Sequence, residues 1–144
     1  MTEREYENYI YVMSDIEKKL HTLAVLMIKY DKYFSDHNRI LDCDLVNEIQ
    51  HYMRYIEKTG SIIEIHGYAI DINSMCARLL NNQRRIVNTL NMRIKSTENP
   101  FTKLISKIKL RKEEQIHLDL REAYDLSLDM KEFVAPYTKG IVVE

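Results

Sequence analysis

The sequence predicts an all-α fold, an elongated bundle of three to five helices with coiled-coil-like heptad seams. Only three Gly and two Pro occur in 144 residues, which leaves little material for the tight turns of an all-β fold. Apolar residues instead recur at intervals of three and four over long segments, which is the period of an amphipathic helix. The composition, 45% hydrophobic and 30% charged, is typical of one ordinary soluble domain and excludes collagen, low-complexity and disulfide-scaffold classes.

The first segment has the clearest period and predicts a helix over about residues 3–34, ended by the turn cluster at 35–38. Its stripe has two interpretations: the core of an antiparallel bundle within the chain, or a seam that meets a second chain. Because Tyr and Met are common at adaptable interfaces, we expect a homo-oligomer or a helical protein partner. The expected oligomer seam consists of Tyr6, Tyr9, Met13, Ile16, Leu20, Leu23, Met27 and Tyr30.

Two shorter signals divide the middle of the chain. Asp42 and Asp44 are candidate N-caps of a second helix, which Thr59 and Gly60 are expected to end. The segment 61–64 has the Ser-x-x-Glu pattern of a capping box, and a stripe from Ile62 to Leu90 follows it in a different phase. The change of phase predicts a break near residue 60, with one bent helix as the alternative. Gln83, the polar member of this stripe, either sets the register as buried polar residues do or tilts to solvent.

Asn99 and Pro100 are typical of the N-cap and first position of a fourth helix. Phe101, Leu104, Ile105 and Ile108 are expected to open its apolar face, which Ile116, Leu120, Ala123, Met130 and Val134 continue. The stretch 109–115 is poor in apolar residues, so a bend or division is expected there, and the helix should end at Ala135-Pro136. The domain prediction is therefore a single bundle over 1–136, followed by a disordered or extended tail over 137–144.

The net charge of −1 conceals an uneven distribution of charge along the chain. Residues 1–77 sum to −5, residues 78–112 to +9, and residues 113–144 to −5. Three interpretations remain open for the basic stretch: neutralisation within the fold or a dimer, a nucleic-acid surface, or an acidic protein or anionic membrane partner. Its members are Arg78, Arg84, Arg85, Arg93, Lys95, Lys103, Lys107, Lys109, Arg111 and Lys112.

One catalytic pattern can be constructed. Glu48 and His51, and again Glu114 and His117, have the Glu-x-x-His spacing that di-metal carboxylate bundles place on two helices. Helix one could offer Glu17 as a further ligand, but the third predicted helix has only Asp71 in place of a Glu, so these four residues are weak candidates and no cofactor is expected. No phosphate loop, nucleophile motif or helix-turn-helix is found.

The sequence therefore favours a non-catalytic helical assembly or adaptor protein that acts through protein–protein interaction and takes no small-molecule substrate. The alternative is a nucleic-acid-binding regulator that uses residues 78–112, and a di-metal enzyme is the third candidate. Two unpaired cysteines and the absence of a signal-peptide pattern predict a soluble intracellular protein of the cytoplasm or nucleus. The many Ile, Asn and Tyr are typical of an AT-rich genome, as in many viruses and low-GC microbes.

Overall fold

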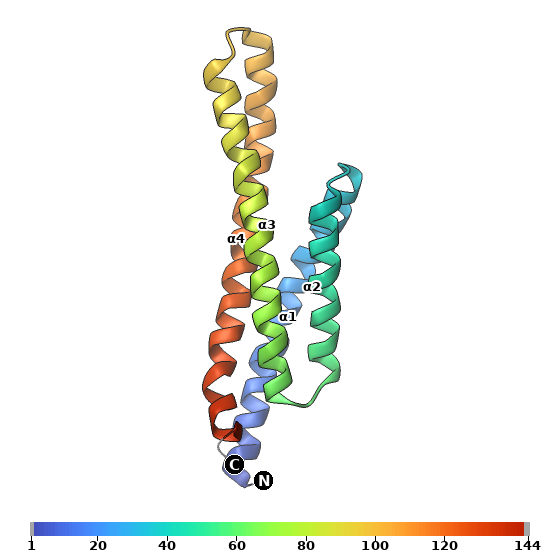
Figure 1. Ribbon diagram of the computed structural model, residues 1–144, viewed down its shortest axis with the longest axis vertical. Coiled ribbons are helices and arrows are strands. Elements are labelled where there is room, and N and C mark those ends of the chain that lie inside the picture. Colours follow the sequence, from blue (N-terminus) through green and yellow to red (C-terminus); the bar gives the residue numbers. More distant parts are fainter. Residues whose placement is uncertain (1, 143–144) are drawn as a thin grey trace.

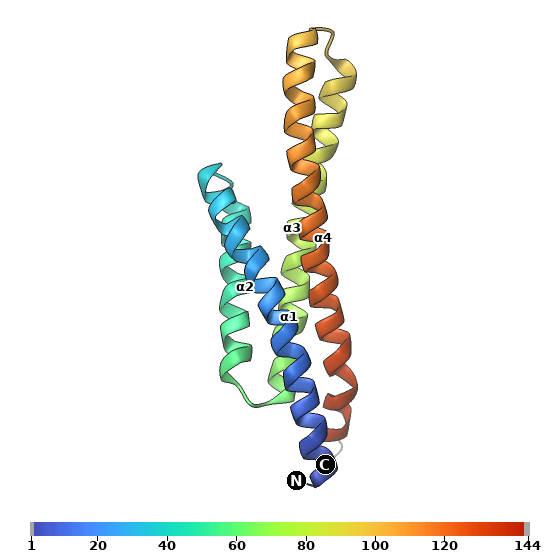
Figure 2. The same cartoon turned by 180° about the vertical axis from the view of Figure 1, so that it is seen from behind.

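The computed structural model describes residues 2–142, and these form four α-helices packed as a bundle, which confirms the predicted fold class. The helices are α1 (Glu3–Asp36), α2 (Ile40–Lys58), α3 (Ile62–Ser96) and α4 (Pro100–Val142). Figure 1 shows that α3 and α4 form one long hairpin, and that the shorter α1–α2 hairpin lies against only part of its length. The start of α1 and the end of α4 lie together at one end of the molecule, opposite the α3–α4 connection (Figure 2).

Local capping explains where three of the helices begin. Thr2 and Glu5 form a reciprocal capping box at the start of α1. The hydroxyl of Ser61 accepts a hydrogen bond from the backbone N–H of Glu64, which confirms the predicted start of α3. The side chain of Asn99 accepts from the backbone N–H groups of Phe101 and Thr102, so α4 begins as predicted at Pro100.

The predicted start of α2 was wrong. This helix begins at Ile40 with Arg39 as the N-cap residue, and no side chain makes a capping hydrogen bond there. Asp42 lies within the first turn of α2 and is buried. Its carboxylate accepts hydrogen bonds from Arg39 and Asn82, so the buried charge is not left without partners. Asn38 makes the sharp reversal between α1 and α2 with a positive φ of 56°, a conformation that Asn tolerates better than most residues.

The chain between α2 and α3 is extended at Thr59 and Ser61, so the predicted break near Gly60 is confirmed and the single bent helix is excluded. The core follows from this order, since α1 packs on α2, α2 on α3, α3 on α4, and α1 on α4. Within the described residues α2 and α4 do not contact each other. The largest side chains fully buried in this core include Tyr30, Phe34, Ile49, Ile72 and Leu120.

The structure differs from three predictions about α4. The helix is continuous through 109–115, and it passes Pro136 without ending. A proline inside a helix removes one backbone hydrogen bond. Tertiary packing offsets this loss here, because Val134, two residues before Pro136, is fully buried against the rest of the bundle. Residues 137–142 are therefore helical rather than an extended arm, and residues 143–144 lie outside the described residues.

Candidate interaction surface on the projecting arm

The α3–α4 hairpin extends beyond the α1–α2 turn as a two-helix projection (Figure 1). We call residues 84–112 the arm, because the α1–α2 turn reaches α3 and α4 at the level of Gln83 and Glu113 through Arg39. The thirteen α3 residues of the arm correspond to about 20 Å of helix at 1.5 Å per residue. The arm coincides with most of the basic stretch found in the sequence.

The interior of the arm is thin and partly polar. The buried residues of the arm are Leu90 on α3 and the small polar Ser106 on α4, each 5% exposed. Lys103 and Leu110, which flank Ser106 on the same face of α4, are only half-buried. The two helices of the arm therefore pack through few apolar contacts.

The apolar residues of the α4 arm lie on another side of that helix. Phe101 is 71% exposed, and Leu104, Ile105 and Ile108 are 56%, 49% and 62% exposed. We call these four residues the outer stripe. The expectation that these residues open the buried apolar face of α4 was wrong as to burial. Ile105 lies eleven residues, or about three turns, before Ile116 and so on nearly the same side of α4, but α1 ends at Asp36 and does not extend over the stripe.

A buried polar network fixes the base of the arm. The Arg39 guanidinium contacts Asp42 at 2.8 Å, the Gln83 carbonyl oxygen at 2.8 Å and the Glu113 carboxylate at 3.4 Å. Gln83 is fully buried and donates its amide N–H groups to the Glu113 backbone oxygen at 2.8 Å and carboxylate at 2.7 Å. The Tyr33 hydroxyl also donates to Glu113 at 3.2 Å. Of the two interpretations of Gln83, the buried one is therefore confirmed.

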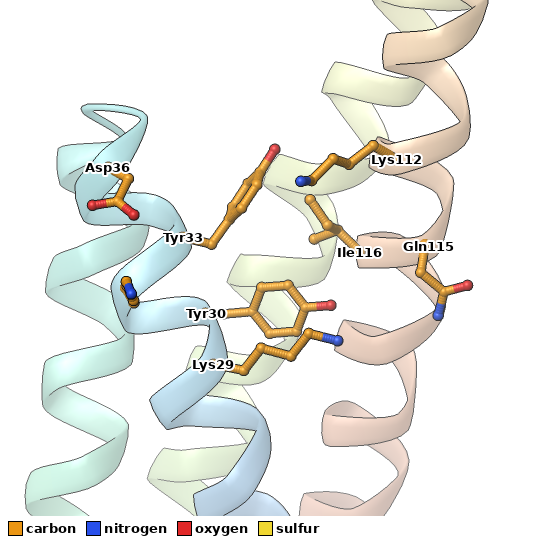
Figure 3. Close-up of a pocket in the computed structure, with 8 residues that line it drawn as sticks. Lys29, Tyr30, Tyr33, Asp36, Lys112, Gln115 and Ile116 are labelled. Carbon is orange, nitrogen blue, oxygen red and sulfur yellow. The ribbon is translucent and has the colours of Figure 1, made fainter.

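A groove of about 410 Å³ lies between the last turns of α1 and the middle of α4 (Figure 3). The Tyr30 hydroxyl donates to the Asp119 carboxylate, which also accepts from Lys29 at 3.1 Å. Burial, the hydrogen bond to Asp119 and its negative charge raise the pKa of Tyr30 well above its ordinary value. Burial opposes the ionisation of Asp119, but the hydrogen bonds from Tyr30, Lys29 and Gln115 outweigh it and lower the pKa of that carboxyl.

The structure exposes the basic stretch almost completely. Nine of its ten side chains are exposed and Lys103 is half-buried. Among the residues that the structure describes, none of the ten lies within salt-bridge distance of a carboxylate. Neutralisation of the basic stretch by ion pairs is therefore not found among the described residues. One member, Lys112, instead places its ammonium group 5.2 Å from the centre of the Tyr33 ring.

The expected oligomer seam of α1 lies mostly inside the chain's own core. Ile16, Leu20, Leu23, Met27 and Tyr30 are at most 5% exposed. Tyr9 and Met13 are half-buried, and Tyr6 alone among the eight is exposed. The structure therefore uses this stripe as an intramolecular core, which leaves little of it for a second chain.

The four metal-ligand candidates are not brought together. Glu48 and His51 lie exposed on α2, whereas Glu114 is exposed and His117 half-buried on α4. These two helices do not contact each other. No group of three or more His, Cys, Asp or Glu side chains among residues 2–138 is arranged to hold a metal ion. The two Glu-x-x-His motifs therefore do not form a di-metal site in this fold.

Sequence reasoning missed two features of this region: the contacts of Arg39 at the base of the arm, and the exposure of the outer stripe. Neither has a local signature, since Arg39 lies in a turn and the stripe resembles a core face.

Within the described part of the chain, no helix has the length and apolar character to cross a membrane. Comparison with known proteins finds no matching family model, no matching curated protein and no matching solved structure.

Proposed function

We propose that this protein is a non-catalytic adaptor whose arm docks an acidic amphipathic helix of another protein along the outer stripe. The observation that carries this proposal is the exposure of four large apolar side chains in a row at the end of a projecting hairpin. Contiguous apolar patches of this kind mark interaction sites on proteins in water. Their spacing of three and four residues matches one side of a helix–helix contact.

The position of the stripe on α4 supports a helix as the occupant. Lys112 and Asp119 lie seven and fourteen residues after Ile105, so the three residues share one side of α4. That side is covered by α1 further along, where Lys112 meets Tyr33 and Asp119 meets Tyr30. Because α1 ends at Asp36, the stripe is the uncovered continuation of a face that already binds a helix.

The charge around the stripe supports an acidic partner. Lys107, Lys109, Arg111 and Lys112 surround the four apolar residues on the same helix and are exposed. Two arms brought together would place these cations against each other, which opposes arm-to-arm pairing of two copies. An amphipathic helix with Glu or Asp beside its apolar face would instead complement the arm in both shape and charge.

A pair of synthetic helical peptides tests this proposal. Both carry Leu at heptad a and d positions, and one carries Glu and the other Lys at the flanking positions. We expect the acidic peptide to bind in fluorescence anisotropy, and Ile105→Glu with Ile108→Glu to abolish that binding. Leu118→Glu is the matched control, because Leu118 is a 59% exposed residue of α4 outside the arm.

Three outcomes would contradict the proposal. They are equal binding of the two peptides, loss of binding in the Leu118→Glu control, and binding to anionic vesicles without binding to the acidic peptide. Sedimentation equilibrium on the same samples tests whether the outer stripe instead binds a second copy of this chain. A dimer that Ile105→Glu abolishes would identify that second copy as the partner.

Exposure of the basic stretch also favours a second candidate, a nucleic-acid-binding regulator. Nine exposed cations without a carboxylate partner among the described residues would release counterions on binding phosphates. The test is oligonucleotide affinity at two salt concentrations. A steep decrease with salt supports this candidate, and no binding at low salt removes it.

A further inference from the structure

A second hollow lies at the base of the arm, where the α1–α2 turn meets α3 and α4. It measures about 390 Å³ and is lined by both arm helices and by the turn residues His37 and Arg39. We call it the notch. Its apolar floor includes Ile86 and Leu90, and its cationic walls include Arg85 and Arg93 of α3 and Lys109 of α4. It is separate from the outer stripe, whose four residues do not line it.

The charge of the notch is not balanced within the chain. Arg85, Arg93 and Lys109 are exposed, and no carboxylate among the described residues lies within salt-bridge distance of them. Glu113 is the one acid in the lining, but it is 7% exposed and already accepts hydrogen bonds from Arg39, Gln83 and Tyr33. Three cations therefore surround a hollow with no opposing charge available to them.

We propose that the notch binds a small polyphosphate-type anion, meaning two or more linked phosphoryl groups. Arg guanidinium groups bind phosphate oxygens in pairs of parallel hydrogen bonds, which favours phosphoryl over other anions. Arg85 and Arg93 are eight residues apart on α3, or about 12 Å along the helix axis. This separation suits a chain of phosphoryl groups better than a single phosphate. Because Gln83 pairs with Glu113, Lys109 on α4 lies near the level of residue 87, between Arg85 and Arg93 along the arm.

The concave shape favours a small anion over a nucleic-acid strand. The α1–α2 turn bounds one side of the notch through His37 and Arg39, and this boundary suits a small anion better than an extended strand. This site is independent of the helix-docking function proposed for the outer stripe. Substitution of Arg85 or Arg93, which lie on α3 away from the stripe, should leave binding of the acidic peptide intact, so the two proposals fail separately.

Isothermal titration with tripolyphosphate at low salt tests the notch directly. We expect binding in the wild-type chain, and about tenfold weaker binding in Arg85→Gln and in Arg93→Gln, as loss of one charge-assisted contact predicts. Arg84→Gln is the matched control, since Arg84 is an exposed neighbour on α3 that does not line the notch. Circular dichroism melts confirm that all variants are folded.

Several results would overturn the proposal. Absence of binding at millimolar tripolyphosphate would do so, as would equal weakening by Arg84→Gln and Arg85→Gln, which would indicate a diffuse basic surface. Citrate binding as tightly as tripolyphosphate would refute the phosphoryl preference. A single-stranded oligonucleotide that binds more tightly, with equal sensitivity to all three Arg substitutions, would assign the arm to nucleic acid instead.

Discussion

Replacement of Arg39 by Met should strongly destabilise the protein. The Arg39 side chain is 14% exposed and is the cation that contacts both Asp42 and Glu113, whose residues are 6% and 7% exposed. Without it, two buried carboxylates lose their positive partner and the Gln83 carbonyl oxygen loses its donor. Breaking a buried ion pair from one side costs about 3–5 kcal/mol, because the remaining charge is left uncompensated.

Urea unfolding followed by circular dichroism measures this cost. With a slope of about 2 kcal/mol per molar urea, a loss of about 3–5 kcal/mol moves the midpoint down by about 1.5–2.5 M. Arg84→Met is the control, because this exposed arginine has no ion-pair partner among residues 2–138, and its replacement should cost less than about 0.5 kcal/mol.

A double-mutant cycle shows whether charge is the cause. Glu113→Gln should cost less in the Arg39→Met background than in the wild-type chain, since it then removes an unpaired buried carboxylate. A midpoint shift no larger than that of Arg84→Met would refute the assignment of Arg39 as the residue that holds the α1–α2 turn to the base of the arm. Additive effects of the two substitutions would refute their coupling.

Three further predictions concern stability and reactivity. Gly67 is exposed within α3 and a Cβ there would meet nothing within 4 Å, so Gly67→Ala should stabilise the protein by about 1 kcal/mol in urea unfolding; a decrease would contradict this. Burial and Asp119 raise the pKa of Tyr30, so this group adds stability below about pH 10 that is lost as pH rises further. The decline above about pH 10 should therefore be shallower in Tyr30→Phe, and identical slopes would argue against the Tyr30–Asp119 contact. Burial raises the pKa of Cys76 to about 12, so a thiol reagent should label the half-buried Cys43 first and Cys76 only on unfolding; equal native rates would contradict the packing.

The sequence was sufficient for most of the helix boundaries because their signals are local. Thr2, Ser61 and Asn99 bond to backbone groups within three residues, so their sequence neighbours determine the geometry. The start of α2 was not predictable in this way. Arg39 makes no capping hydrogen bond there, and its side chain contacts partners 44 and 74 residues away.

The candidate site depended on a difference that spacing alone does not reveal. Phe101 and Ile108 have the same apolar periodicity as Ile116 and Ala123, but only the second pair is buried. Which side of α4 meets α3 follows from the complete hairpin, in which Glu113 lies opposite Gln83 and Ser106 lies in the interior of the arm. The basic residues were visible in the sequence as a run of cations, but their exposure followed only from the two-helix projection, because neutralisation was one of the open interpretations.

The common location of the two ends of the fold has a mechanical consequence. The first turn of α1 and the last turn of α4 lie at one end of the molecule, and the arm tip lies at the other (Figure 1). The 43 residues of α4 correspond to about 64 Å of continuous helix between these ends. A surface, label or fused domain attached at the end where α1 starts and α4 finishes would hold the arm tip, with its apolar and cationic groups, at that distance.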